Sequence, residues 1–313
     1  MNRFDKLKLL ITSRNLIKEI DLRDYDTHTK GGHTIRQSLK KSTPYHLYVE
    51  INHEKNSVIL EFTSKILTVD AYKLISSETI HQCLDKIKQI AKIDFDNEEI
   101  LNQADVCACH ITLDTEIDCP LKELQESIRK ETNYAKWEVD ARNNGNIIVE
   151  SKAKTGRYRL RMTIYNKHRE LMLAKNKEFR NLIGKEGMEH YKNTVRIELT
   201  ANSKHLIRKL LNIPHTTLAT VLQSKEDTVY DTYRKIFAKI PDRPLNIKPY
   251  KYFQIRSILE RYNNDLSVIE RHIRIATGRT PRTQIMNEYR LVRATLYAER
   301  SRSVAVAHCG RPK

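Results

Sequence analysis

Two short segments in the middle of the chain constrain its fold more than any other stretch. Residues 159–167 (RLRMTIYNK) and 195–200 (VRIELT) alternate apolar and polar side chains with a period of two. That period is typical of a β-strand with one face in the core and a chemically different opposite face. The second face would carry Arg161, Thr163, Tyr165, Arg196, Glu198 and Thr200. Strands with a polar outer face are common, so this pattern predicts strands but by itself indicates no activity.

Other segments carry patterns of both strands and helices. The polar intervals NHEKN and NNGN are typical turns, and each lies between two β-rich runs. A period of 3.6 predicts helices, one of them capped by Asn166 and ending near Gly184 or Gly187. The predicted strands are 45–51, 57–65, 106–114, 137–141 and 147–152, and the predicted helices are 76–91, 120–128 and 166–183.

The order strand, helix, strand occurs twice, in residues 57–114 and 159–200. We therefore expect an α+β fold: a mixed sheet built from two strand-helix-strand units, with helices on one face. Three of the eight prolines lie between residues 241 and 249, where they interrupt any helix. This predicts a domain of residues 1–240, followed by a small helical module of residues 241–313.

The chain carries a strong positive charge. Its 313 residues include 56 Lys and Arg against 39 Asp and Glu, a formal net charge of +17. Such a charge favours a polyanionic partner, and nucleic acid is the leading candidate. The C-terminal module is basic as well, and a pair of helices that contacts DNA is one interpretation, a solvated charged tail the other. The candidate contacts are Arg256, Arg271, Arg274, Arg279 and Arg282.

Several other classes are disfavoured by what the sequence lacks. No apolar run approaches the ~20 residues that cross a bilayer, and the first residues do not resemble a signal peptide. We therefore expect a cytoplasmic protein with no membrane partner. The five cysteines include no CxxC pair, which disfavours a structural zinc site. The chain contains no GxxxxGK[ST] phosphate loop, which disfavours ATP hydrolysis, and no His-x-His pair, which disfavours a metal site built on two histidines of one strand.

Tyr165 is the candidate nucleophile for an attack on a phosphodiester. A phenol has an ordinary pKa near ~10 and reacts poorly at neutral pH unless positive charge favours the phenolate. Arg161 and Lys167 are near in sequence, and a helix that begins at Asn166 would point its N-terminus at an anion. Arg196 on the other strand is a further candidate for neutralising phosphate charge.

Three side chains on polar strand faces could bind a divalent cation. His110 and Asp114 are four residues apart on one predicted strand and so share a face. If that strand neighbours residues 195–200, Glu198 could join them around Mg²⁺ or Mn²⁺. Each acid taken singly is more commonly a surface residue or an ion-pair partner.

The chain resembles the replication initiators of rolling-circle plasmids and the related replication proteins of filamentous phages. The resemblance rests on LYVEIN, VILEFTSKIL, CHITLD, LRMTIYNKHRE and VRIELT in this order, and covers residues 45–200. It implies that Tyr165 nicks one DNA strand at an origin, stays joined to the 5′ phosphate and leaves a 3′ hydroxyl as primer. It also implies that Glu198 and Asp114 bind Mg²⁺ or Mn²⁺. His110 stands where the family often has Asp, which leaves the ligand set open, and Tyr158 and Tyr191 are alternative nucleophiles.

Three functions compete. The first is a metal-dependent nicking and rejoining enzyme that initiates rolling-circle replication. The second is an initiator or repressor that binds origin DNA without cutting it, and the third is a mobilisation relaxase. Origin DNA, double-stranded and single-stranded, is the expected partner, and a host helicase and a second copy of the chain are further candidates.

Overall fold

The computed structural model describes residues 2–41, 44–116, 121–132, 134, 136–143, 145–153, 155, 158–225, 227–237, 249–276, 283–294 and 296. The chain forms two compact units. The first comprises Met1–Ile117 and Lys136–Tyr233, and the second comprises Asp118–Ala135 and Arg234–Lys313. The predicted boundary at residue 240 lies in a segment outside the described residues.

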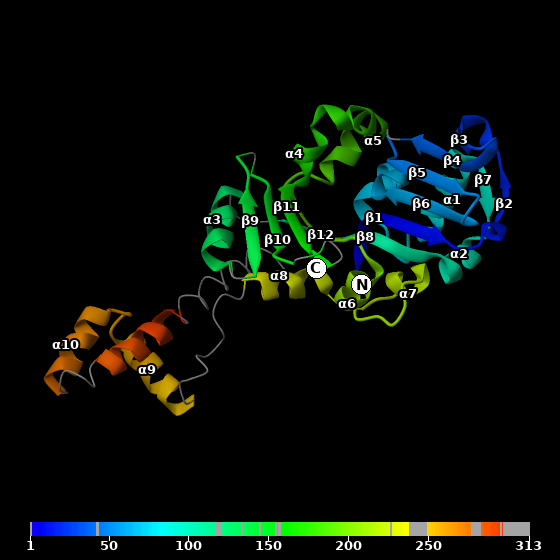
Figure 1. Cartoon of the computed structure of the whole chain (residues 1–313). Coiled ribbons are helices and arrows are strands. Elements are labelled where there is room, and N and C mark those ends of the chain that lie inside the picture. Colours follow the sequence, from blue (N-terminus) through cyan, green and yellow to red (C-terminus); the bar gives the residue numbers. More distant parts are fainter. Residues whose placement is uncertain are drawn as a thin grey trace. The chain divides into compact units, whose positions relative to one another are not determined.

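The first unit is built on one ten-stranded sheet, drawn in Figure 1. Its strand order is β3-β4-β5-β6-β1-β8-β12-β11-β10-β9, and every neighbouring pair is antiparallel. The strands are β1 (Arg3–Ile11), β3 (Asp26–Lys30), β4 (His33–Lys41), β5 (Leu47–Asn52), β6 (Ser57–Thr63), β8 (Asp105–Glu116), β9 (Trp137–Ala141), β10 (Ile147–Ser151), β11 (Arg161–Asn166) and β12 (Thr194–Ala201).

The sheet consists of two halves with the same strand arrangement. In each half the first strand of the chain lies at the centre, the last strand lies beside it, and three strands continue outward. The first half therefore reads β1, β6, β5, β4, β3 from the centre, and the second reads β8, β12, β11, β10, β9. The halves meet where β1 pairs with β8, and Figure 1 shows the blue and green strands joined there. The repeat is thus a five-stranded unit.

One face of the sheet forms the core of this unit. Side chains on alternate positions of the strands point into it, and the register stacks them across strand after strand: Leu9 pairs with Leu60, Leu60 with Val49, and Ile197 with Ile164. These side chains are inaccessible or nearly so. Burial of apolar side chains stabilises a fold by about 25 cal/mol per Å² of apolar area removed from water, so this face contributes to stability.

Helical segments and a two-stranded sheet complete the first unit. Local signals set their ends: Ser203 accepts a hydrogen bond from the amide of Leu206 at one helix start, and Asp96 caps another. They are η1 (Arg14–Leu16), η2 (Leu22–Asp24), η3 (Ser64–Lys73), α1 (Ile80–Ala91), α2 (Asn97–Gln103), α4 (Lys167–Leu171), η5 (Ala174–Asn176), α5 (Lys177–Glu189), α6 (Lys204–Leu211) and α7 (Leu218–Leu222), with β2 (Ile17–Ile20) paired to β7 (Ile93–Phe95). Helix α8 (Thr228–Phe237) begins in this unit.

The second unit is helical. It contains α3 (Leu121–Glu131), α9 (Pro249–Arg261) and α10 (Leu266–Ala276), and residues 283–294 are helical too. Helices α9 and α10 are joined by four residues, in which Asn263 and Asn264 take positive φ angles of 51° and 61°. Asparagine tolerates this conformation better than most residues, which permits so short a connection.

The α+β prediction is confirmed, and so are both hairpins and the strand at 106–114. Two details were wrong. The sheet is antiparallel throughout the described residues, where a mixed sheet was expected. The predicted helix after Asn166 is divided into α4, η5 and α5.

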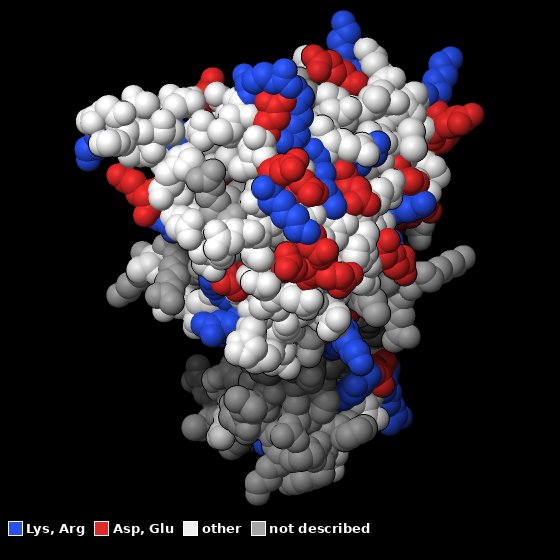
Figure 2. Space-filling view, turned by 90° about the vertical axis from the view of Figure 1, so that its right-hand side faces the viewer, with Lys and Arg blue, Asp and Glu red and all other residues white. Residues whose placement is uncertain are grey.

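No helix among the described residues is long and apolar enough to cross a membrane. Figure 2 shows the first unit from the side of β3 and β4, with acidic and basic side chains interspersed over that face. The positive net charge is therefore not gathered into an uninterrupted patch on this side.

Candidate functional site

Strand β12 lies between β8 and β11, and this places the predicted site residues on one polar face. Tyr165 on β11 is opposite Arg196, which is in turn opposite Asp114 on β8. Glu198 is opposite Thr112, and Thr200 is opposite His110. The sequence-based condition that these strands be neighbours is therefore met.

A short hydrogen bond joins Tyr165 and Glu198. The phenolic hydroxyl donates a hydrogen bond of 2.6 Å to Glu198 Oε1, and each residue is only 8 % exposed. Burial, together with the negative charge of Asp5, raises the pKa of Glu198 to about 7 despite the opposing charge of Arg196. A carboxyl with such a pKa can accept and return a proton near neutral pH.

The surroundings of Tyr165 differ from expectation. Neighbouring cations were expected to favour the phenolate, but burial, followed by the negative charge of Glu198, raises the pKa of Tyr165 well above its ordinary value. The phenol is therefore protonated in this state, and any attack by its oxygen requires transfer of the proton to a base. Glu198 is already hydrogen-bonded to that proton.

Arg196 is wholly buried and forms ion pairs with two carboxylates of the protein. Its Nε and Nη2 donate to the two oxygens of Asp114 at 2.6 and 2.7 Å, and Nη1 donates to Asp5 at 2.6 Å. An unpaired guanidinium in this position would be very unfavourable, so both partners are needed. The prediction that Arg196 faces a phosphate does not fit this arrangement, because two carboxylates already neutralise it.

Asp5 is a site residue that the sequence pattern did not reveal. The register of β1 against β8 shifts between Phe4 and Lys6, so an extra residue bulges from the strand. Bulges change the direction of a side chain without ending the strand. Asp5 here accepts hydrogen bonds from Arg196 and from the hydroxyl of Ser64 at 2.8 Å. The alternation of apolar and polar residues does not predict a bulge at this position, and no sequence motif indicates one.

The predicted metal ligands are only partly assembled. His110 Nδ1 lies 3.9 Å from Glu198 Oε2, too far for a hydrogen bond. Asp114 is not turned toward a common site, since Arg196 occupies both of its oxygens. Among the described residues, no three His, Cys, Asp or Glu side chains converge in a way that could hold a cation. The present arrangement therefore does not fit the expected three-ligand site for Mg²⁺ or Mn²⁺.

Lys167 contributes a buried positive charge beside the tyrosine. Its Nζ lies 5.8 Å from the centre of the Tyr165 ring and 3.0 Å from Glu170 Oε2. Asn176 also donates to Glu170 and accepts a bond of 2.6 Å from Lys65. Burial opposes ionisation of Glu170, but Lys167 and the Asn176 hydrogen bond outweigh it and lower its pKa to about 2. Lys167 is thus held by Glu170 at the start of α4.

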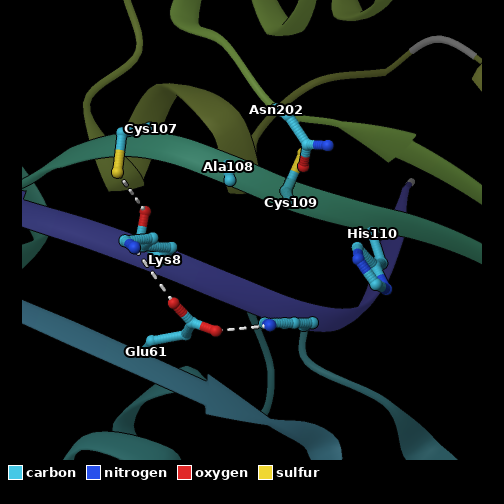
Figure 3. Close-up of a pocket in the computed structure, with 8 residues that line it drawn as sticks. Lys8, Glu61, Cys107, Ala108, Cys109, His110 and Asn202 are labelled. Carbon is cyan, nitrogen blue, oxygen red and sulfur yellow. Dashed lines mark hydrogen bonds and ion pairs between the residues drawn. The ribbon is translucent and has the colours of Figure 1, made fainter. Parts of the chain in front are cut away.

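Arg161 is the most accessible of the predicted catalytic cations. It lies on the same strand as Tyr165, is exposed, and forms an ion pair with Glu150 on β10. A pocket of about 400 Å³ lies on the polar face between β1 and β8, and is lined by Lys6, Lys8, Glu61, Cys107, Ala108, Cys109, His110 and Asn202. Figure 3 shows Glu61 bridging the two lysines, with His110 at one side.

The alternative tyrosines lie in different surroundings. Tyr191 is buried in an apolar cluster with Phe179 and Ile183, and burial raises its pKa above the ordinary value. Tyr158 is 48 % exposed, and its ring meets His205 edge-on with centroids 5.0 Å apart. Of the three tyrosines, only Tyr165 donates a hydrogen bond to Glu198.

The predicted DNA contacts in the second unit can be placed only in part. Arg256 on α9 forms an ion pair with Glu260 at 3.0 Å, and Arg271 is exposed on α10. Arg274 belongs to α10, but its side chain lies outside the described residues, as do Arg279 and Arg282 entirely.

No known protein family model matches this chain, and no curated protein shows significant sequence similarity to it.

Proposed function

We propose that this chain is a replication initiator that nicks one strand of origin DNA with Tyr165 and remains joined to the 5′ phosphate. The observation that carries the proposal is the 2.6 Å hydrogen bond from the Tyr165 hydroxyl to a buried carboxylate whose pKa is raised to about 7. A nucleophile bonded to its own base is the usual arrangement for covalent catalysis. The high positive charge, and the resemblance to rolling-circle initiators over residues 45–200, supply the substrate class.

In the proposed reaction, the Tyr165 oxygen attacks the phosphorus as its proton passes to Glu198. The bond from phosphorus to the 3′ oxygen breaks, and the leaving oxygen takes up a proton to become the 3′ hydroxyl. The new phosphotyrosine bond keeps the energy of the phosphodiester, so the reverse reaction can rejoin the strand without ATP.

Other side chains of the polar face have supporting roles in this proposal. Lys167 places positive charge beside the reacting oxygen, and Arg161 with the pocket lysines Lys6 and Lys8 would contact the phosphates on either side. Arg196 positions the strands by binding Asp5 and Asp114. Mg²⁺ or Mn²⁺ stays a proposal from the resemblance, and because the residues do not form a complete cation site here, no step above passes through a metal.

A second candidate function is an initiator that binds origin DNA without cutting it. One observation favours it: Tyr165, Glu198 and Arg196 form a buried and largely satisfied polar network, which is also what a purely structural cluster would show. A mobilisation relaxase would share the nicking chemistry, and differs in acting at a transfer origin.

The decisive experiment incubates the full-length protein with supercoiled plasmid carrying the DNA that flanks its gene. Parallel reactions contain Mg²⁺, Mn²⁺ or a chelator. The proposal predicts open circles and a protein–DNA adduct that survives denaturing detergent. Tyr165→Phe is expected to abolish the adduct and retain DNA binding, because only the nucleophilic oxygen is removed.

Tyr158→Phe and Tyr191→Phe are the matched controls and are expected to form the adduct. Adduct formation by Tyr165→Phe would show that another residue is the nucleophile. Binding without nicking under all three conditions would favour the non-enzymatic initiator. Nicking only at a transfer origin, in a plasmid that replicates without this protein, would identify a relaxase.

A further inference from the structure

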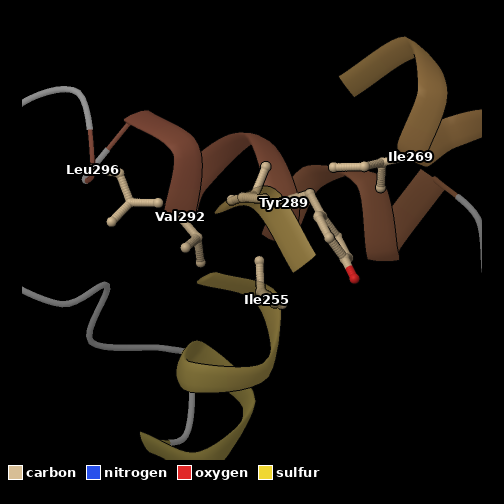
Figure 4. Packing of buried hydrophobic residues seen from close by; sticks show 6 residues of the cluster. Ile255, Ile269, Tyr289, Val292 and Leu296 are labelled. Carbon is tan, nitrogen blue, oxygen red and sulfur yellow. The ribbon is translucent and has the colours of Figure 1, made fainter. Parts of the chain in front are cut away.

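Three helical segments of the second unit share one apolar core. Helices α9 and α10 and the helix over residues 283–294 contribute Ile255, Leu259, Ile269, Tyr289 and Val292, and Leu296 beyond that helix joins them; all six are nearly inaccessible to solvent. Figure 4 shows Ile255 and Ile269 facing Tyr289 and Val292 across this core. An ion pair of 2.7 Å between Lys251 on α9 and Glu288 also ties the third helix to the first. One side of the third helix is therefore fixed against its neighbours.

The opposite side of the third helix is exposed and polar. Met286, Tyr289 and Val292 are buried, whereas Thr283, Gln284, Asn287 and Arg290 are exposed. Positions 283, 287 and 290 follow each other at spacings of four and three, which places them in one line along the helix. Gln284 lies beside this line. The helix thus presents an uninterrupted polar stripe to its surroundings.

The composition of this stripe matches the edges of base pairs. Asn and Gln bond adenine through two contacts and Arg bonds guanine in the same way. Arg290 Nη1 donates to Asn287 Oδ1 at 3.1 Å, so the two side chains are already aligned along the helix. Glu288, the one acidic residue between positions 283 and 296, is turned to Lys251 instead. Nothing negative on this stripe would repel a phosphate backbone.

We propose that the helix over residues 283–294 enters the major groove of duplex DNA and reads base edges with Gln284, Asn287 and Arg290. Its length, about 18 Å at 1.5 Å per residue, suits a groove about 12 Å wide. The surrounding charge fits this occupant, since residues 254–313 carry eleven Arg and one Lys against five acids. The inference rests on the proposed function in taking origin DNA as the partner, but it requires no strand cleavage.

The test is a selection of binding sequences by the full-length protein from a library of short duplexes with randomised sequence. The wild-type protein is expected to enrich a defined motif. Gln284→Ala and Asn287→Ala are each expected to weaken binding to the selected duplex by roughly tenfold or more. Both variants should bind a scrambled duplex as the wild type does, because phosphate contacts position the protein without reading sequence.

Gln254→Ala on α9 removes another exposed amide and is the matched control, expected to bind the selected duplex normally. Circular dichroism of each variant checks that the helices are intact. If no motif is enriched, or if Gln284→Ala and Asn287→Ala bind the motif as tightly as the wild type, the inference is wrong. If both variants are folded but bind the scrambled duplex more weakly than the wild type does, that result would also contradict base reading.

Tyr165→Phe separates this inference from the nicking proposal. That variant should enrich the same motif as the wild type. Enrichment without nicking by the wild type would count against the nicking proposal alone, whereas nicking that is indifferent to Gln284 and Asn287 would count against the inference alone.

Discussion

At the scale of single residues, the charged side chains of the site are buried, and their interactions with one another decide which of them is ionised. Arg196 is inaccessible to solvent and is held by Asp5 and Asp114, so these three groups together carry one negative charge. A third carboxylate, Glu198, is buried and lies close enough for Asp5 to disfavour its ionisation. Buried like charges push pKa values apart, and here the acid that keeps its proton most readily is the one bonded to Tyr165.

The raised pKa of Glu198 predicts a pH-dependent stability. Its pKa is about 7 in the folded chain against 4.5 ordinarily, so between these values the folded state binds more protons than the unfolded state. Its stabilising effect is complete below pH 4.5 and is lost as the pH rises through 7. Relative to Glu198→Gln, which cannot ionise, the wild type should lose up to roughly 3 kcal/mol of unfolding free energy over this interval.

Urea unfolding at a series of pH values measures this difference. Tyr165→Phe keeps the carboxyl and should retain the wild-type fall in stability. Parallel curves for the wild type and Glu198→Gln would mean that Glu198 titrates normally in the fold.

At the scale of elements, α5 contains a break at Gly184 and packs against α4, the helix that begins with Lys167. Gly184 has φ 66° and ψ −169°, a conformation almost confined to glycine. The break brings Gly187 so close to the preceding turn that an added Cβ would lie 2.7 Å from the Cβ of Ile183. Ile183 and Phe179 of α5 in turn pack on Leu171 at the end of α4.

Gly187→Ala should therefore destabilise the protein by roughly 1–3 kcal/mol, because the new methyl group overpacks against Ile183. Gly184→Ala should cost a similar amount, also roughly 1–3 kcal/mol, through backbone strain, since its surroundings leave space for a methyl group. Lys185→Ala on the exposed side is the control, expected within about 0.5 kcal/mol of wild type. Denaturant midpoints would contradict the interpretation if Gly187→Ala matched Lys185→Ala.

At the scale of the whole molecule, charge and topology act separately. The net charge of +17 bears on which molecules the chain could bind. The fold depends instead on the apolar face of the sheet, which the two five-stranded halves share. Figure 2 shows acidic and basic side chains interspersed over one face of the first unit. Under the proposed function, DNA would bind at particular basic side chains, and each bound phosphate would release counterions.

Binding of the full-length protein to a short duplex should weaken roughly tenfold or more between about 50 and 200 mM salt, because phosphate contacts release condensed cations. Fluorescence anisotropy titrations at several salt concentrations measure the slope. Tyr165→Phe alters no charge on the cationic side chains and should give the same slope. Affinity that is unaffected by salt would exclude a substantial phosphate interface.

Much of the fold was predictable where the pattern is local. The strands containing Tyr165, Glu198 and His110, and the hairpin β5–β6, follow from alternation and turn residues alone. The residues before Lys41 were assigned no elements from the sequence, yet they form β1 to β4. β1 pairs with β6 and β8, and β2 with β7, and these partners lie far away in the chain, where a local pattern does not reveal them. β3 and β4 form a local hairpin, which the sequence prediction missed. The division after Asn166 also escaped prediction, and the divided segment packs on Ala71 of η3, a contact that no local pattern shows.

The sequence by itself determined which side chains share a strand face, because alternation is a property of neighbouring residues. It thereby placed Tyr165, Arg196 and Glu198 on polar faces. Only the tertiary structure decided what those side chains contact. Strand pairing places Arg196 opposite Asp114, and a bulge in β1 brings Asp5 to the same guanidinium. Burial raises the pKa of Tyr165, so its phenol keeps its proton. These outcomes depend on contacts between residues far apart in the chain and on exclusion of water, which no local pattern records.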